Sequence, residues 1–158
     1  MNRLRDVFVD QIALCHQDRG WFPTLKEVLQ GLTVEQAVWK PGNHHSIAEL
    51  VNHLTYWNEI WLERFQGGTP VVHESNDQSF SSEAALVDEE QWQAAVAKLN
   101  QVMDAWSSSL RQCPEIKMNE ALPGEAADST WWEVLSVLTT HNVYHLGQMV
   151  YIRKQQGI

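Results

Sequence analysis

The chain has 158 residues, of which 44% are hydrophobic and 20% are charged, and its formal net charge is −9. A chain of this length buries a substantial core, so we expect one domain over residues 1–158 without extensive disorder. The negative charge and the lack of any run of Lys or Arg argue against nucleic acid as a partner, because phosphate binding needs clustered cations.

The N-terminal part of the chain predicts an interrupted helix. A first helical segment runs from about residue 2 to residue 16, is interrupted near residues 20–23 by Gly and Pro, and resumes over residues 25–29. His16, near the end of the first segment, is expected to be solvated.

Five pairs of residues predict helix starts. In each pair a Ser, Thr or Asp is followed three positions later by Glu or Gln, whose side chains together satisfy free N–H groups at the start of a helix. The pairs are Thr24 with Glu27, Thr33 with Gln36, Ser46 with Glu49, Asp88 with Gln91, and Thr130 with Glu133. Each pair precedes a run of helical periodicity.

Three long segments repeat apolar residues with the period of a helix, over about residues 47–66, 88–112 and 131–155. The clearest seam is Trp92, Val96, Leu99, Met103, Trp106 and Leu110. No segment alternates for long with the period of a strand. The sequence therefore predicts an all-α fold with four principal helices. Large side chains such as its eight tryptophans commonly fill cores and also line apolar pockets.

The connection from Gly67 to Val87 is long for two helices that neighbour each other in an antiparallel pair. It can carry the chain back along the bundle. The second and third helices could then run parallel, which is the long-crossover variant of a four-helix bundle.

The sequence predicts a protein without membrane-spanning helices and with reduced cysteine thiols. The stretch from Met1 to Gln11 mixes charged and apolar residues, unlike a secretory signal, and no stretch approaches the ~18 apolar residues of a membrane span. Cys15 and Cys113 lack CxxC spacing, which suits free thiols better than a disulfide framework. We expect a cytoplasmic location.

Three histidines are candidate metal ligands. His141 and His145 are four positions apart, so both lie on one face of their helix, and helical projection directs that face inward. His53 lies at the edge of the apolar stripe of the helix over residues 47–66. If these two helices are antiparallel, the three imidazoles lie at one level.

A single inward histidine is more often a hydrogen-bonded core residue than a ligand. Three at one level are different, because each buried polar ring without a partner costs about 1–3 kcal/mol, and one shared cation satisfies all three. Neutral imidazole suits zinc, nickel, copper or iron, and three protein ligands leave positions for water or substrate. The chain lacks the HExxH motif of zinc proteases and the Glu-x-x-His pairs of di-iron bundles.

Two blocks resemble the DinB family: H-S-I-A-E-L-V-N-H at residues 45–53 and H-N-V-Y-H-L-G-Q at residues 141–148. The layout over residues 21–64, with W-K-P at residues 39–41, is also similar. The resemblance implies an up-down-down-up bundle, a divalent metal ion bound by the residues at 53, 141 and 145, and a homodimer. Zinc and nickel are the expected ions, with iron and manganese as alternatives. Relatives include thiol-dependent transferases and the mycothiol-dependent maleylpyruvate isomerase.

Three further residues are candidates for catalysis, each with a structural alternative. Gln148 follows His145 by one turn and can orient a ligand or a bound water. Tyr56 lies three positions after His53 and can act as an acid or donor, although ordinary packing explains it as well. Glu49 precedes His53 by one turn and can act as a base, although its capping role already explains it.

Three functions are consistent with these residues. The first is a metal-dependent transferase or hydrolase that uses a low-molecular-weight thiol or metal-activated water on a small-molecule substrate. The second is a non-catalytic metal or small-ligand binding protein of a stress response. The third is an interaction protein without metal.

Overall fold

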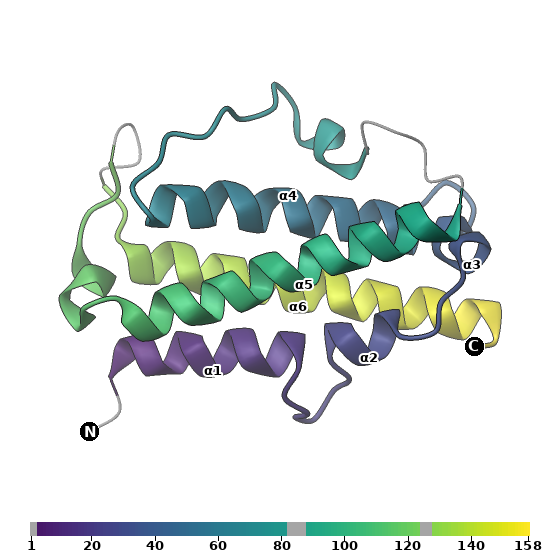
Figure 1. Ribbon diagram of the computed structural model, residues 1–158, viewed down its shortest axis with the longest axis horizontal. Coiled ribbons are helices and arrows are strands. Elements are labelled where there is room, and N and C mark those ends of the chain that lie inside the picture. Colours follow the sequence, from purple (N-terminus) through teal and green to yellow (C-terminus); the bar gives the residue numbers. More distant parts are fainter. Residues whose placement is uncertain (1–2, 82–87, 124–127) are drawn as a thin grey trace.

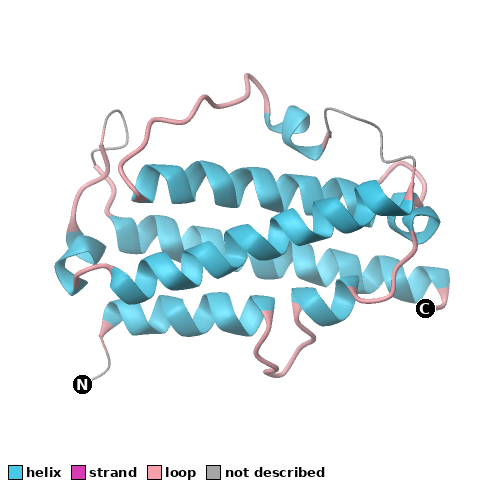
Figure 2. Ribbon diagram, in the orientation of Figure 1, coloured by secondary structure: helices cyan, strands magenta, loops and turns pink. Residues whose placement is uncertain are grey.

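The computed structural model describes residues 3–81, 88–123 and 128–158. Within these residues the regular structure is helical, and the only strand-like pairing is one isolated bridge between Ala121 and Thr130 (Figure 2). The α-helices are α1 Leu4–His16, α2 Leu25–Leu29, α3 Val34–Val38, α4 Ile47–Phe65, α5 Glu89–Gln112 and α6 Trp131–Gln156, and the 3₁₀ helices are η1 Asn76–Phe80 and η2 Glu115–Asn119. The all-α prediction is confirmed. None of the helices in these ranges is long and apolar enough to cross a membrane.

The predicted helix starts agree with the observed ones. At the start of α4, the Ser46 hydroxyl accepts a hydrogen bond from the Glu49 backbone N–H at 3.2 Å, and the Glu49 carboxylate accepts one from the Ser46 N–H at 2.9 Å. Capping hydrogen bonds also open the other predicted helices, at Thr24, Thr33, Asp88 and Thr130. The first helix begins at Leu4, and the predicted start at residue 2 lies outside the described residues.

Four long helices lie side by side, and their directions fix which ends meet (Figure 1). In this view α1 and α6 run from left to right, whereas α4 and α5 run from right to left. α4 packs against α5, α6 and η1, and α1 packs against α5 and α6. The chain after α4 runs back over that helix, where η1 lies against it. The predicted connection over residues 67–87 is described as far as residue 81.

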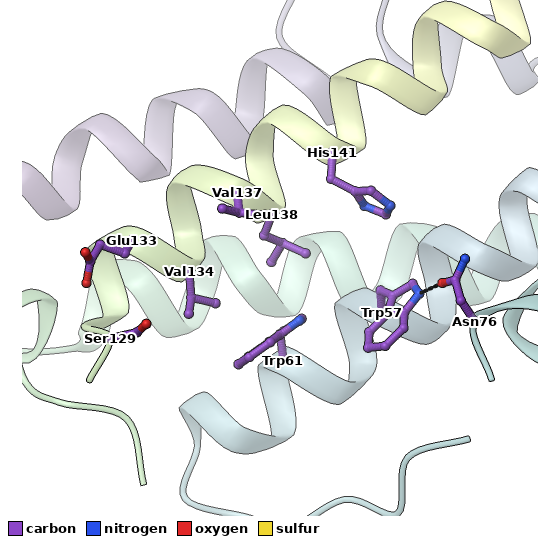
Figure 3. A pocket seen from close by; sticks show the side chains of 9 residues that line it. All are labelled: Trp57, Trp61, Asn76, Ser129, Glu133, Val134, Val137, Leu138 and His141. Carbon is purple, nitrogen blue, oxygen red and sulfur yellow. Dashed lines mark hydrogen bonds between the residues drawn. The ribbon is translucent and has the colours of Figure 1, made fainter. Parts of the chain in front are cut away.

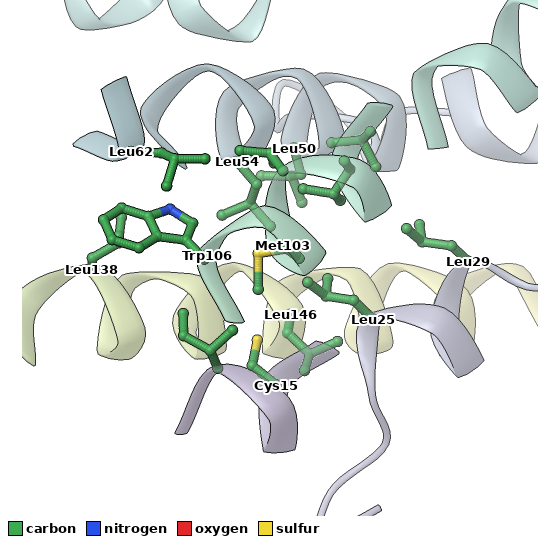
Figure 4. Close-up of a cluster of buried hydrophobic side chains, with 14 of the residues drawn as sticks. Cys15, Leu25, Leu29, Leu50, Leu54, Leu62, Met103, Trp106, Leu138 and Leu146 are labelled. Atoms are coloured by element: carbon green, nitrogen blue, oxygen red, sulfur yellow. The ribbon is translucent and has the colours of Figure 1, made fainter. Parts of the chain in front are cut away.

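The core lies between these helices and is built largely from the predicted apolar seams. Figure 4 shows Met103 and Trp106 of α5 among side chains from α4 and α6. Five members of the predicted α5 seam are completely buried, namely Trp92, Leu99, Met103, Trp106 and Leu110. The indole N–H of Trp106 donates to the Asn58 carbonyl at 3.1 Å, so its polar edge is satisfied inside the core.

A pair of buried amides joins α4 to α6. Asn58 donates to the Oδ1 atom of Asn142 at 2.9 Å, and Asn142 donates back to the Oδ1 atom of Asn58 at 3.2 Å. Both side chains are completely buried. Because a one-turn slip would leave both amides unsatisfied in the core, this pair fixes the register of the two helices beside His141.

His16 is buried, and the prediction that it is solvated is wrong. The last turn of α1 packs against α5, where the Nε2 atom of His16 lies 2.9 Å from the Oδ1 atom of Asn100. Only 1% of His16 is exposed, and this burial lowers its pKa.

Candidate metal centre

Three imidazoles from two helices meet between α4 and α6. His53 comes from the second turn of α4, and His141 and His145 come from the middle of α6. The Nε2 atom of His141 lies 3.0 Å from the Nε2 atoms of both His53 and His145. One nitrogen from each ring lies within 4.8 Å of the other two, close enough for all three to bind one metal ion. The predicted meeting of these side chains is therefore present.

A serine outside the long helices sets the orientation of His53. The Nδ1 atom of His53 lies 2.6 Å from the Ser79 hydroxyl oxygen, and that hydroxyl donates its own hydrogen to the Asn76 carbonyl at 2.5 Å. Ser79 must therefore accept from an N–H at Nδ1 of His53. This leaves the lone pair of the His53 Nε2 atom free and directed toward the other two rings.

Gln148 does the same for His145. Its side-chain oxygen lies 2.7 Å from the Nδ1 atom of His145, and its side-chain nitrogen donates to the Tyr144 hydroxyl at 3.1 Å. With the amide in this orientation, His145 carries its hydrogen on Nδ1 and a free lone pair on Nε2. Gln148 thus lies beside a candidate ligand, as the sequence led us to expect, and contacts it on the side away from the centre.

The surroundings keep the three imidazoles neutral. Burial, reinforced by the neighbouring imidazoles, lowers the pKa of His53 to about 3 and that of His141 to about 4. Burial also lowers the pKa of His145, although its hydrogen bond with Gln148 acts in the opposite direction. Neutral imidazole is the form that binds a metal ion.

The donor set fits a divalent transition metal. Two of the three converging Nε2 atoms carry lone pairs, and a single N–H on His141 can make a good hydrogen bond with only one of them. With its hydrogen on Nδ1 instead, His141 would offer a third lone pair, and a cation between the rings would accept all three. Three imidazole ligands without a thiolate or carboxylate suit zinc, nickel, copper or iron.

The 3₁₀ helix η1, which the sequence had not predicted, covers the centre. Phe80 stacks between two histidine rings, with centroid distances of 4.0 Å to His53 and 3.8 Å to His45. Ser79 and Phe80 are both buried by this packing. A start signal for η1 exists in Ser75 and Gln78, which are hydrogen-bonded at 3.2 Å, but nothing in the sequence links this segment to His53.

A pocket of about 410 Å³ opens beside His141 (Figure 3). One wall comes from α4 and the other from α6; the lining residues include Trp57 and Trp61 of α4 and Val134, Val137, Leu138 and His141 of α6. We call it the tryptophan pocket. Its volume falls in the range of about 300–1,000 Å³ that is typical of small-molecule sites.

The other two candidate catalytic residues have partners away from the imidazoles. The Tyr56 hydroxyl accepts a hydrogen bond from the His73 backbone N–H at 2.6 Å, and its ring stacks on His73 at 4.3 Å. The Glu49 carboxylate caps α4 and lies 2.6 Å from the Lys40 ammonium. Burial would raise the pKa of the Glu49 carboxyl, but the hydrogen bonds from Lys40 and Ser46 outweigh it and the net pKa is lowered.

Comparison with known proteins identifies one family. The family model described as the DinB superfamily matches residues 18–149, more than half of the chain, and this range contains all three histidines of the centre. No curated protein and no solved structure matches the chain.

Proposed function

The chain belongs to the DinB superfamily, and on that premise we propose that it is a metal-dependent enzyme acting on a small molecule at the three-histidine centre. The observation that carries this proposal is the convergence of three Nε2 atoms, two of them with their lone pairs directed inward by Ser79 and Gln148. A catalytic ion keeps an open position, and three protein ligands leave one.

The tryptophan pocket supports a catalytic role for the same centre. It reaches His141, so a molecule in the pocket lies next to one of the three imidazoles. When bound, a divalent ion lowers the pKa of a coordinated water or thiol and polarises a carbonyl group. Ser79 and Gln148 hold the ligand rings, while Phe80 and the tryptophans limit the access of water.

Family membership supports a finer version of the proposal. We propose that α1 with α2, α4, α5 and α6 form an up-down-down-up four-helix bundle with its long crossover between α4 and α5, in a single domain over residues 1–158. We further propose a cytoplasmic homodimer that transfers a low-molecular-weight thiol or uses activated water for hydrolysis. Zinc or nickel is the proposed ion, and iron or manganese the alternative.

A second function is a non-catalytic metal or small-ligand binding protein of a stress response. The observation in its favour is the state of the nearest candidate base, Glu49, whose carboxylate is already engaged by Ser46 and Lys40 and whose pKa is lowered. A weak base with two partners is poorly suited to accept a proton from a substrate.

Elemental analysis of protein purified without an affinity tag tests the centre. We expect about one equivalent of divalent metal per chain in the wild type and less than about a tenth in His141→Ala, which lacks one of three ligands. His44→Ala is the matched control, because His44 is an exposed histidine outside the cluster. Wild type that neither contains nor takes up metal would contradict the proposal.

An assay of turnover distinguishes the metal-dependent enzyme from the non-catalytic binding protein. Metal-loaded wild type is incubated with an electrophile and glutathione, bacillithiol, mycothiol or coenzyme A, and with hydrolysable esters and amides. The enzyme proposal expects turnover that His53→Ala abolishes. Stoichiometric metal with no turnover on any of these, and a His53→Ala variant that only melts at lower temperature, would favour the binding protein.

A further inference from the structure

The walls of the tryptophan pocket are fixed by contacts outside it. The Trp57 indole N–H donates to the side-chain oxygen of Asn76 at 3.1 Å (Figure 3), and the Arg64 guanidinium lies 4.7 Å from the centre of the Trp61 ring. Both indoles come from α4 and are one turn apart, so they form a continuous aromatic wall. Because the rings are already held, a ligand that packs against them pays little ordering entropy.

The pocket has one end at the histidine cluster and one end away from it. Figure 3 shows His141 and Trp57 at one end, and Ser129 and Glu133 at the other. Between these ends the lining is apolar, with Val134, Val137 and Leu138 opposite the indoles. A ligand lying along the pocket would therefore have one end at the histidine cluster, and the rest of it would lie between apolar walls.

The charged side chains that line the pocket favour uncharged ligands over anionic ones. Among the described residues that line it, none is Lys or Arg, and Glu133 is the one charged side chain. The Glu133 carboxylate already accepts hydrogen bonds from the Thr130 N–H at 2.7 Å and from the Thr130 hydroxyl at 2.8 Å. With no cationic side chain and one carboxylate, the walls away from the histidine cluster disfavour phosphate-bearing and other anionic groups.

We propose that the tryptophan pocket determines substrate specificity by binding an uncharged aromatic group whose polar head lies at His141. Indole rings pack favourably against aromatic rings in offset or edge-to-face contact, and burying a ring of phenyl size strengthens binding at least about tenfold. The placement of the ligand's polar head at His141 depends on the proposed metal function. The binding of its aromatic group depends only on the pocket.

Calorimetry with two matched ligands tests the proposal on zinc-loaded protein. Acetohydroxamic acid supplies a metal-binding head alone, and phenylacetohydroxamic acid adds a phenyl group to the same head. We expect the phenyl compound to bind at least about tenfold more tightly to the wild type. The ratio of the two affinities should fall to about two or less in Val137→Asp, which adds a carboxylate to the pocket wall. Because Val137 is 69% exposed, we expect this variant to fold as the wild type does.

Ser136→Asp is the matched control, because Ser136 is the exposed neighbour of Val137 on α6 and does not line the pocket. It should keep the wild-type ratio. Equal affinity of the two compounds for wild type, or a tenfold ratio that survives in Val137→Asp, would overturn the proposal and leave the metal centre standing.

A second readout needs no metal. In chelator-treated protein, benzyl alcohol should shift the indole N–H resonances of Trp57 and Trp61 in the wild type and in Ser136→Asp, and shift them less in Val137→Asp. If the protein takes up no zinc, the proposed metal-dependent function fails, but this measurement still tests whether the tryptophan pocket binds an aromatic group. Unshifted indole resonances would overturn the proposal for the pocket.

Discussion

Two residues that are not themselves candidate ligands determine how the ligand rings point. Ser79 and Gln148 each accept an N–H from an imidazole Nδ1 atom, and each is fixed in turn by a further hydrogen bond, to Asn76 and to Tyr144 respectively. Such outer contacts select the tautomer and raise the basicity of the ligating nitrogen.

Replacement of Ser79 should weaken metal binding. Ser79→Ala removes the acceptor of the His53 Nδ1–H, so the ring can rotate or change tautomer, and we expect metal affinity to fall about 10–100-fold. Titration with a competing chelator measures the change. Ser81→Ala, two positions further along and exposed, should bind metal as the wild type does; similar affinities in the two variants would show that Ser79 does not orient His53.

At the scale of the residue, the sequence predicts what helical geometry dictates. The spacing of His141 and His145 places both on one face, and Gln148 follows on that face, so their proximity was foreseeable. Ser79 was not, because it approaches His53 from an irregular connection, and neither apolar periodicity nor spacing encodes where such a connection lies. The environment of His16 was missed because a helix end near a polar loop does not reveal that another helix packs over it.

The position of Glu49 in the first turn of α4 explains this residue by a structural role, although a carboxylate there could also act in catalysis. Glu49 accepts a hydrogen bond from the free Ser46 N–H, and its carboxylate also lies 2.6 Å from the Lys40 ammonium and 3.4 Å from the Nδ1 atom of His45, all at the helix N-terminus. A carboxylate in the first turn is stabilised there by the helix dipole as well.

Loss of this carboxylate should therefore affect stability more than metal binding. We expect Glu49→Ala to lower the free energy of unfolding by about 1 kcal/mol, because a capping partner of α4 is lost, and to retain metal. Urea unfolding and elemental analysis measure the two effects. Glu63→Ala, at an exposed position in the last turns of the same helix, should change stability by less than about 0.5 kcal/mol. A stable Glu49→Ala protein that loses turnover would instead assign the carboxylate to catalysis.

The helices themselves were largely predictable, because capping pairs and apolar periodicity are local signals. The α5 seam and the starts of α4, α5 and α6 follow directly from them. The 3₁₀ helix η1 was not predicted, because five residues are too few to display a period, and its burial depends on contact with α4 rather than on its own composition.

At the scale of the whole molecule, the neutral imidazoles link stability to pH. In the unfolded chain each histidine takes up a proton near pH 6.5, whereas in the folded chain the pKa is about 3 for His53 and about 4 for His141, and it is lowered for His145. Below pH 6.5 the unfolded chain thus binds more protons, so the free energy of unfolding must fall as pH falls from about 6.5 toward 4.

Urea unfolding of the chelator-treated protein between pH 7.5 and 4.5 measures this dependence. Each of these histidines adds a slope of up to ~1.4 kcal/mol per pH unit below pH 6.5. His16 adds a contribution of the same sign, because its pKa is also lowered. In His141→Ala one contribution is removed and the slope should be shallower by that amount, so identical slopes in wild type and variant would contradict the assignment.

His53 and His141 are in contact although 88 positions separate them along the chain. An ion held by both would close a loop that spans more than half of the polypeptide, as a disulfide does, yet through bonds that exchange. It would tether the first half of the chain to the last helix only in the folded state, and its contribution would rise and fall with the concentration of free ion. The concentration of free ion would then determine how strongly the first half of the chain is held against α6.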